Sequence, residues 1–356
     1  MLIVDAHLDL SMNALEWNRD LTKSVKEVRE REKGKTDKPD RGNNTVTFQA
    51  LRKGNIGLVV GTMIARYVDE SNPLPGWHSP AQAWAQTQGQ LAWYRAMEKE
   101  EQIKIIASKN QLKNHLTYWN ETKSSQKTIG LILSLEGADS IIDSDYLQLA
   151  YSNGLRALGP AHYGPGRYAN GTDATGHLNA DGKKLLTKMN SLKMILDATH
   201  LCDDAFCDAM DIYTGPIWAS HNNCRSIVNH NRQFDDNQIK ALIKKNGVIG
   251  AAFDAWMIVP GWKRGVSNSK ELDCNLNKLI DHMLHICNLS GNSNHIAIGS
   301  DLDGAFGTEQ SPYDIDTITD LQLLPAMLSS RGFVDEDIRK IMHQNWIDFL
   351  LRNLPE

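Results

Sequence analysis

The sequence feature that most constrains the fold is a recurring pair of segments, a short apolar run followed by a longer amphipathic stretch. The runs are rich in Val, Ile, Leu and Ala, and most of the stretches after them have apolar residues three or four positions apart. Parallel strands that are covered by helices produce this pattern. Eight runs qualify, at residues 2–5, 56–64, 129–135, 155–161, 193–198, 216–220, 247–253 and 295–299.

Eight such units predict an α/β protein with the fold of a (β/α)8 TIM barrel, and 356 residues are enough for one barrel. A ninth apolar run, residues 103–107, is expected to be peripheral because nothing chemically notable follows it. We predict a single domain, residues 1–356, with a charged insertion at about 18–45 that forms a solvated helix and loop. Further helices are expected at residues 80–101, 235–247, 271–289, 320–330 and 335–352.

The composition excludes several classes of protein. Hydrophobic residues make up 41% of the chain and charged residues 23%, and no window approaches the roughly 20 apolar residues of a membrane-spanning helix. The net charge is −5, and the basic residues form no stripe that could bind a phosphate backbone. We therefore expect neither a membrane nor a nucleic acid as a partner.

The five cysteines are an odd number without a tight spacing pattern, which favours reduced thiols over a disulfide framework. The first apolar run begins at residue 2, so no export signal is visible before it. Both observations predict a cytoplasmic protein, although a chain whose leader had been cut off would look the same. The oligomeric state stays open, with a homodimer among the alternatives.

Histidine and acidic side chains directly follow most of the predicted strands. In a parallel barrel the carboxyl ends of all strands meet at one rim, where the active sites of this fold are built. Residues from distant parts of the chain are therefore expected to meet there. The candidates, in chain order, are His7, Asp9, Glu136, His162, His200, His221 and Asp301.

Five of these residues match the donor set of a two-metal site. His7 and Asp9 are two positions apart, so both side chains point to the same face of an extended strand. Zinc sites use imidazole and carboxylate ligands, and a bridging carboxylate with two ligands on either side gives a two-metal centre. Together with Glu136, His200 and His221, the pair supplies the five donors that such a centre needs. Taken singly, each has an ordinary explanation as a chance pair, an ion pair or a core histidine. Their coincidence favours a pair of metal ions.

Seven short motifs occur in an order and at separations that are specific when taken together. They are Asp5-Ala-His-Leu-Asp9, Leu135-Glu-Gly137, Gly154-Leu-Arg156 up to His162, Leu196-Asp-Ala-Thr-His200, Ala219-Ser-His221, Arg232-Gln-Phe-Asp235 and Ile298-Gly-Ser-Asp-Leu-Asp-Gly304. With these motifs the chain resembles, over nearly its whole length, the membrane (renal) dipeptidase family, zinc peptidases related to the amidohydrolase barrels. The resemblance implies a barrel of the metal-dependent hydrolase type.

The resemblance also implies how the five metal-ligating residues are divided. His7 and Asp9 hold one zinc ion, His200 and His221 hold the other, and Glu136 bridges the two ions.

Three further roles follow from the resemblance alone. It implies that His162 binds the scissile carbonyl oxygen, that Arg232 pairs with the free carboxylate of the substrate, and that Asp301 holds the amino terminus and relays a proton. Two alternatives stay open, that Arg232 is a surface arginine and that Asp303, two residues on, takes the role of Asp301. Residues 163–166 depart from the usual pattern of the family, which leaves the side-chain preference open.

The sequence therefore predicts a metallodipeptidase that hydrolyses dipeptides, including those with a C-terminal D-residue, by attack of a hydroxide that bridges two zinc ions. No Gly-x-Ser-x-Gly motif offers a serine nucleophile. One alternative is a related hydrolase that acts on an N-acyl amino acid, a lactone or a phosphoester. Another is a catalytically silent barrel that binds a ligand.

Overall fold

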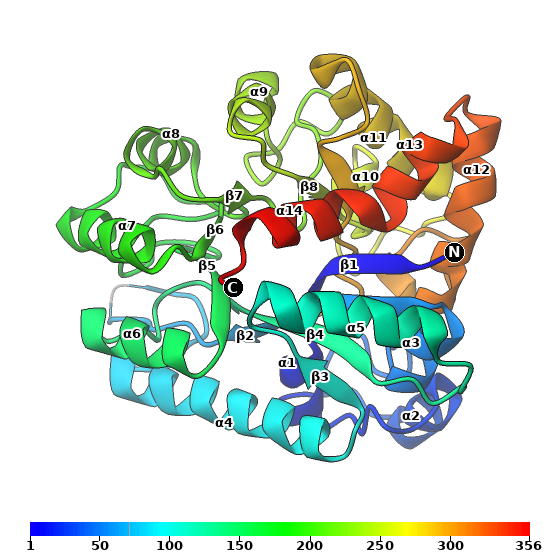
Figure 1. The fold of residues 1–356 in the computed structure, drawn as a ribbon, viewed down its shortest axis with the longest axis horizontal. Coiled ribbons are helices and arrows are strands. Elements are labelled where there is room, and N and C mark those ends of the chain that lie inside the picture. The colour runs from blue at the N-terminus through cyan, green and yellow to red at the C-terminus, as the bar shows by residue number, and fades with distance from the viewer. Residues whose placement is uncertain (71) are drawn as a thin grey trace.

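Parallel strands close into a barrel in the computed structural model, which describes residues 1–70 and 72–356 (Figure 1). The strands pair in the order β7-β6-β5-β4-β2-β1-β9-β8, and a bridge between Ala219 and Ile249 joins the two ends of this row. The predicted (β/α)8 barrel is confirmed. The barrel strands are β1 (Ile3–Leu8), β2 (Ile56–Ile64), β4 (Ile129–Glu136), β5 (Leu155–Gly159), β6 (Ile195–Asp197), β7 (Ile217–Trp218), β8 (Ile249–Ala251) and β9 (Ile296–Ile298).

The ninth apolar run forms β3 (Ile103–Ile105), which pairs with β4 outside the closed row of strands, as predicted. Its helix α5 (Lys109–Glu121) lies against α14 (Asn345–Asn353). The extra strand therefore extends the sheet at one side and contributes no side chain to the barrel mouth.

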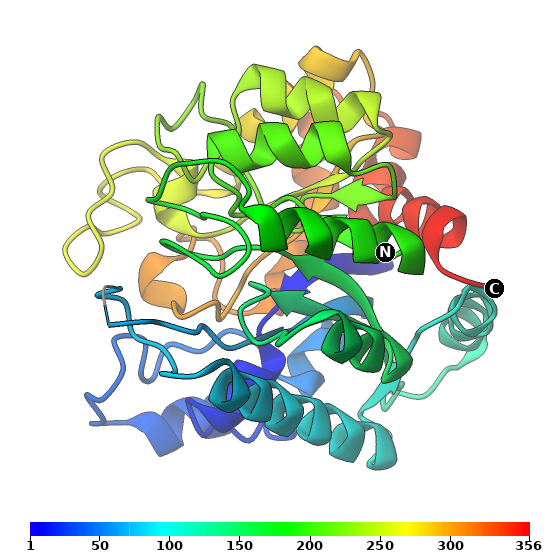
Figure 2. The same ribbon diagram turned by 90° about the vertical axis from the view of Figure 1, so that its left-hand side faces the viewer.

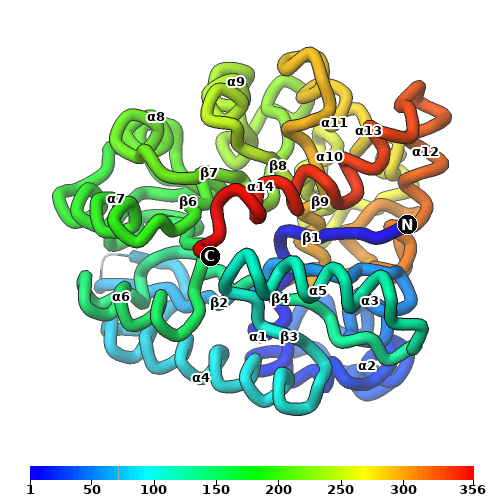
Figure 3. Tube along the Cα trace, viewed as in Figure 1, coloured from blue at the N-terminus to red at the C-terminus, as the bar shows by residue number. Residues whose placement is uncertain are grey.

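Helices surround the barrel, as Figures 1 and 3 show. The predicted helix at 271–289 begins only at Leu276, because Asn275 caps it by accepting a hydrogen bond from the amide of Lys278. Within the described residues, none of the helices combines the length and the apolar character needed to cross a membrane. The other helices are α1 (Leu10–Leu15), α2 (Val25–Glu32), α3 (Phe48–Lys53), α4 (Pro80–Lys99), α6 (Ser144–Ser152), α7 (Ala180–Leu192), α8 (Asp203–Ile212), α9 (Asp236–Lys244), α10 (Ala255–Ile258), α11 (Leu276–Ser290), α12 (Leu324–Ser330) and α13 (Asp335–Arg339).

The amino-terminal end of the barrel is closed by α14, which crosses it in Figure 1. A buried cluster draws apolar side chains from strands all round the barrel and from this helix. Trp346 packs edge-on against Trp218, with ring centroids 5.5 Å apart, and donates a hydrogen bond to the carbonyl of Ile298. This end is a packed core. The long loops project from the opposite end, away from the C-terminus (Figure 2), and the site lies there.

The charged insertion contains α2 and a long loop. It was predicted to be solvated, but some of its charged side chains are buried. Arg19 is buried and donates hydrogen bonds to the carboxylates of Glu32 and Asp40, which are buried as well. Where the insertion ends, the amide and hydroxyl of Thr45 donate to the buried carboxylate of Asp303. The charges of this segment pair with each other because folding brings them together, so the insertion is fixed to the rim of the barrel.

One buried histidine outside the site gives a testable pH dependence. His282 accepts a hydrogen bond from the amide of Cys224 and donates one to the carbonyl of Ile258, so it is neutral. Burial lowers the pKa of His282 to about 4. Because its pKa in the unfolded chain is about 6.5, the unfolded state takes up the proton first as the pH falls. This contribution to stability is complete above about pH 6.5 and is lost as the pH falls toward 4.

We therefore expect His282→Gln to be less sensitive to acid than the wild type. Between pH 7.5 and pH 5, the wild type should lose about 2 kcal/mol more unfolding free energy than the variant, at about 1.36 kcal/mol per pKa unit. Urea denaturation of both proteins at the two pH values measures the difference. Equal losses would show that His282 does not titrate with a lowered pKa in the folded protein.

Candidate metal centre and active site

The predicted site residues meet at the carboxyl ends of the strands, around a cavity of about 310 Å³. His7 lies just beneath the cavity, buried with only 1% of its surface exposed. Residues from β1, from the end of β4 and from the loops after β5, β6, β7 and β9 are thus brought to one place by the closed sheet. The predicted residues that line the cavity are Asp9, Glu136, His162, His200, His221, Arg232 and Asp301.

Glu136 lies at the centre of the cluster, and its two carboxylate oxygens face different partners. Its Oε2 is 3.5 Å from Nε2 of His7. Its Oε1 is 3.1 Å from Nε2 of His200 and 3.5 Å from Nε2 of His221. The last residue of β4 therefore extends one oxygen toward each group of ligands, which is the arrangement expected of a bridging carboxylate.

The first group contains two carboxylates beside His7. Asp9 Oδ1 is 3.9 Å from Nε2 of His7 and is hydrogen-bonded to the hydroxyl of Thr62. Asp301 Oδ1 is 3.7 Å from the same nitrogen. His7, Asp9 and Glu136 each offer an atom within 4.8 Å of the others, a separation that one cation could span with all three.

In the three histidines predicted to be metal ligands, the nitrogen that faces away from Glu136 contacts a hydroxyl group. Ser220 Oγ is 3.2 Å from Nδ1 of His7 and 2.9 Å from Nδ1 of His221. Thr172 Oγ1 is 2.9 Å from Nδ1 of His200. A hydroxyl can accept a proton from Nδ1, which leaves the lone pair of Nε2 free for a metal, and such outer contacts are usual around zinc ligands.

The buried Nε2 of His7 has no hydrogen-bond partner, and Nε2 of His200 lies 3.2 Å from Nε2 of His221. Buried polar atoms are normally satisfied, and a cation would satisfy this nitrogen of His7. The two nitrogens of His200 and His221 can share a hydrogen bond at this distance, and they are also close enough for both to bind one metal ion at about 2.0–2.1 Å. The residues therefore fit a bound cation on both sides of Glu136. The donor set of imidazole and carboxylate groups is one that zinc prefers.

The electrostatics of the cluster also suit cations. Burial would lower the pKa of His7, but Glu136, Asp9 and Asp301 raise it to about 10. Burial and the neighbouring Glu136 raise the pKa of Asp9 to about 6, and burial raises the pKa of Asp301 well above its usual range. Against burial, His7 and the other imidazoles lower the pKa of Glu136 well below its usual value. The three carboxylates lie close together in a buried site, so a bound cation would stabilise their charged forms.

The structure distinguishes the two aspartates of the last motif. Asp301 lines the cavity, whereas Asp303 is turned away from it and accepts hydrogen bonds from Thr45 and Val46. Gly304 is needed next to them, because a Cβ at this position would lie 2.0 Å from Oδ1 of Asp301. The geometry therefore favours Asp301 as the residue that faces a substrate.

His162 and Arg232 also face the cavity. Nε2 of His162 is 3.9 Å from Oε1 of Glu136, and burial lowers the pKa of His162 to about 4, so its ring is neutral. Arg232 is 2% exposed, which rules out the alternative of a surface arginine. Its guanidinium donates to Asn222 and to the carbonyl of His221, and its remaining N–H groups are free for a ligand in the cavity.

Several residues around the site were not found from the sequence. Ser220 contacts Nδ1 of two of the predicted ligand histidines and could have been found inside the motif Ala219-Ser-His221. Arg66 contacts His162 and lies two residues after the end of the second strand, a position close to the one that identified Glu136. Asp254 also lines the cavity and directly follows the predicted strand at 247–253, so the same signal could have found it. Arg264, another lining residue, lies in an irregular segment after α10 and carries no such signal.

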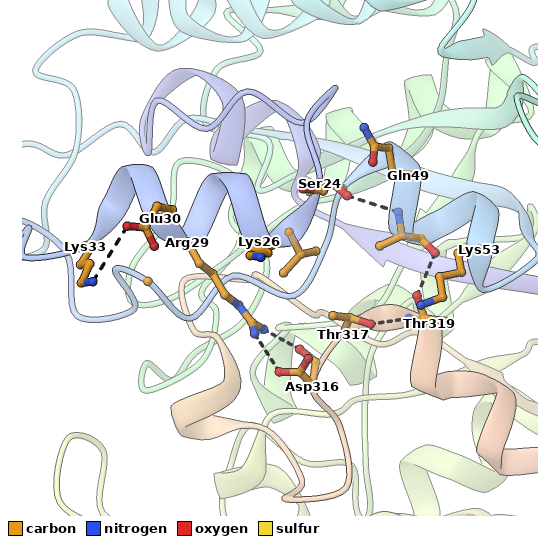
Figure 4. A pocket seen from close by; sticks show the side chains of 14 residues that line it. Ser24, Lys26, Arg29, Glu30, Lys33, Gln49, Lys53, Asp316, Thr317 and Thr319 are labelled. Carbon is orange, nitrogen blue, oxygen red and sulfur yellow. Dashed lines mark hydrogen bonds and ion pairs between the residues drawn. The ribbon is translucent and has the colours of Figure 1, made fainter.

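A second cavity, of about 650 Å³, lies between α2, α3 and residues 316–319 (Figure 4). Four of its charged side chains form ion pairs: Arg29 contacts Asp316 at 2.8 Å and Lys33 contacts Glu30 at 3.9 Å. In the described part of the chain, the groups of His, Asp and Glu that could share an ion all lie in the barrel mouth. The candidate active site is therefore the smaller cavity, in the barrel mouth.

A barrel with imidazole and carboxylate groups gathered at the carboxyl ends of its strands is an arrangement that suits a metal-dependent hydrolase. Comparison with known families makes the assignment specific: residues 1–351 match the family described as membrane dipeptidase, peptidase family M19. The chain belongs to this family of metallodipeptidases, which hydrolyse peptide bonds, and the predicted resemblance is confirmed.

Solved structures and sequence relatives agree with this assignment. A dipeptidase AC of family M19 superposes with a TM-score of 0.81 at 22% identity, covering 100% of this chain and 99% of that one. A Rhodobacter sphaeroides metallopeptidase, liganded with a phosphinate mimic of L-Ala-D-Ala, superposes with a TM-score of 0.80 at 21% identity and 99% coverage of both chains. These likenesses support the fold.

Among sequence relatives, dipeptidase tcpJ of Claviceps purpurea is 28% identical over 232 residues, which are 62% of this chain and 51% of that protein. An uncharacterized Klebsiella pneumoniae protein from the pqqA 5′ region is 27% identical over 234 residues, or 63% of this chain and 82% of its own. The match thus spans about half the length of the fungal dipeptidase.

Replacing Ser220 with alanine is expected to weaken metal binding without removing any ligand. The variant loses the hydroxyl that contacts both His7 and His221, so these rings lose the contact that fixes their orientation. Zinc affinity should fall by about 10–100-fold. Competition titration with a chromogenic chelator measures it, with Ser11→Ala, a buried serine outside the metal cluster, as the matched control. Equal affinities of Ser220→Ala and wild type would contradict the role.

Proposed function

We propose that this protein is a dipeptidase that uses two zinc ions and cleaves the peptide bond between two free-ended residues. The observation that carries the proposal is the orientation of Glu136, whose Oε2 faces His7 while its Oε1 faces His200 and His221. A single-metal site would need only one of these groups. His7 and Asp9 would hold one ion, His200 and His221 the other, and Glu136 both.

Zinc ions bound by these residues would supply a nucleophile from water near neutral pH, so no serine or cysteine nucleophile is required. The protein itself provides the residues that orient the substrate. His162 is placed at the edge of the cluster to contact the scissile carbonyl oxygen. A donor aimed at the charge that develops on this oxygen commonly contributes a factor of about 10²–10³ to the rate.

The two ends of a dipeptide would be recognised by opposite charges. Arg232 presents a planar guanidinium that suits a carboxylate, and burial makes this pairing stronger than at the surface. Asp301 faces the cavity beside His7 and would hold the amino terminus and pass a proton to the leaving amine. A cavity of about 310 Å³ is at the small end of ligand sites, which restricts the substrate to a small molecule.

The same two contacts favour a dipeptide over the alternative substrates. An N-acyl amino acid has no amine for Asp301, and a lactone has no carboxylate for Arg232. We also propose that a D-residue is accepted at the C-terminal position. The metallopeptidase of Rhodobacter sphaeroides, which shares this fold, was crystallised with a mimic of L-Ala-D-Ala, and this supports the proposal.

A panel of L,L and L,D dipeptides tests the proposed function. The zinc-loaded protein should hydrolyse both kinds, and a chelator should abolish the activity until zinc is restored. N-acetylated and C-amidated versions of the same dipeptides serve as matched controls and should be poor substrates. If the free dipeptides survive while a blocked peptide, a lactone or a phosphoester is hydrolysed, the substrate assignment is wrong.

A further inference from the structure

Arg66, two residues after the end of β2, contacts His162, the one histidine of the site whose Nδ1 meets no hydroxyl among the described residues. Nη2 of Arg66 lies 2.8 Å from Nδ1 of His162, and Nη1 donates to the carbonyl of Pro75 at 2.9 Å. A guanidinium has no acceptor and stays protonated, so Nδ1 of His162 must be the acceptor in this contact. A neutral imidazole has a single N–H, which is therefore on Nε2, the nitrogen that faces the site.

The three histidines proposed as metal ligands have the opposite kind of hydrogen-bond partner on Nδ1. Each has a serine or threonine hydroxyl against Nδ1, and a hydroxyl can accept the proton of that nitrogen. Ser220 contacts both His7 and His221 but has one proton of its own, so at least one of these rings donates to it. These rings can therefore present a lone pair on Nε2, whereas His162 presents an N–H.

This difference matters because position alone would let His162 bind a metal. His162, Glu136 and His200 offer ligand atoms that lie within 4.8 Å of one another, as close as the atoms of the other candidate groups. An imidazole nitrogen that carries a proton has no lone pair for an ion. The partner of Nδ1 therefore decides whether this ring acts as a ligand or as a hydrogen-bond donor.

The ring plane of His162 is already fixed by its neighbours. The ring packs edge-on against His200, with centroids 4.5 Å apart, and against Tyr163 at 4.9 Å. Arg66 also keeps its buried Nε without a partner, an unfavourable arrangement that calls for a compensating role. With the ring held in place, the position of its proton is the property that remains for Arg66 to set.

We propose that Arg66 is a positioning residue that fixes the proton of His162 on Nε2, so that His162 acts as a hydrogen-bond donor in the site and not as a metal ligand. The consequence for the rate rests on the proposed function, but the position of the proton does not. The two can therefore be tested separately.

Nitrogen-15 NMR of the histidine side chains tests the proton position directly. In wild-type protein with zinc, the His162 signal, assigned by its loss in His162→Gln, should show a protonated Nε2 and an unprotonated Nδ1. The three ligand histidines should show the reverse. A His162 ring protonated on Nδ1, or bound to zinc through Nε2, would overturn the proposal whatever the activity of the protein.

Kinetics of Arg66 variants test the consequence. Arg66→Met should lower kcat for dipeptides by about 10–100-fold with KM changed less than about threefold, because the lost donor acts in the transition state. Arg66→Lys keeps a donor and should retain most of the activity. Arg167→Met is the matched control, since Arg167 lies in the loop after β5 and, among the described residues, its guanidinium donates to the backbone carbonyls of Ile141 and Ile142.

The two kinds of failure are distinguishable. If wild-type protein hydrolyses no dipeptide, the proposed function fails, and the NMR result still decides the proton position. If Arg66→Met keeps a protonated Nε2 on His162 and full kcat, the role of Arg66 is wrong while the dipeptidase assignment stands. If Arg66→Met does not fold, the wild-type spectrum still shows the proton position of His162, and the kinetics of Arg66→Lys still test the role of Arg66.

Discussion

Replacing Glu136 with glutamine is expected to reduce dipeptide hydrolysis by at least about 10³-fold in kcat/KM, or about 4 kcal/mol of transition-state stabilisation. The amide keeps the shape of the side chain but loses the charge that faces both groups of histidines. Zinc content should fall from two ions to one or none per chain. Steady-state kinetics and elemental analysis of the purified variant measure the two effects.

The control for this variant is Glu98→Gln, which changes a carboxylate on α4 that accepts a hydrogen bond from the amide of Ile105, far from the site. It should bind two zinc ions and keep wild-type kinetics. Circular dichroism of metal-free Glu136→Gln checks that the fold is retained. If Glu136→Gln binds two zinc ions as tightly as the wild type, Glu136 does not bridge them.

The second large effect is expected at Arg232, where the C-terminal carboxylate of the substrate is proposed to bind. Arg232→Met should lower kcat/KM for dipeptides by about 10²–10³-fold, because a carboxylate left in a buried site without its charged partner costs about 3–4 kcal/mol. Dipeptides with an amidated C-terminus lack this charge and should lose less than about tenfold. The ratio between the two substrates, measured on each protein, isolates the carboxylate contact.

Two checks separate this contact from structural damage. Arg232 also donates to the carbonyl of His221, so zinc content is measured to show that the metal centre is intact. Arg331→Met is the matched control, because Arg331 pairs with Asp281 and does not line the cavity. An equal loss on free and amidated dipeptides would mean that Arg232 supports the structure and does not recognise the substrate carboxylate.

The barrel and the place of the site could be predicted because both depend on local patterns. An apolar run marks a buried strand wherever it occurs, and a charged residue directly after it, such as Glu136, must lie at the carboxyl end. Closure of the sheet then brings these ends together without further information. The roles of His162, Arg232 and Asp301 needed the family resemblance, because strand position does not say which end of a substrate a side chain faces.

Contacts between distant segments could not be predicted in this way. Arg66 and His162 are separated by 96 positions, and their contact depends on how two loops cross at the rim. A run of charges looks the same in a sequence whether it faces water or pairs internally, so the buried network of Arg19, Glu32 and Asp40 was interpreted as solvated. Such pairings are set by tertiary structure alone.

The most direct test of a two-ion centre is a crystal structure of the zinc-loaded protein, with anomalous difference maps recorded on both sides of the zinc absorption edge. We expect two peaks about 3.5–4 Å apart. One should lie beside His7 and Asp9, the other beside His200 and His221, with an oxygen of Glu136 about 2.0–2.2 Å from each. A single peak, or two peaks of which either fails to contact Glu136, would contradict the account.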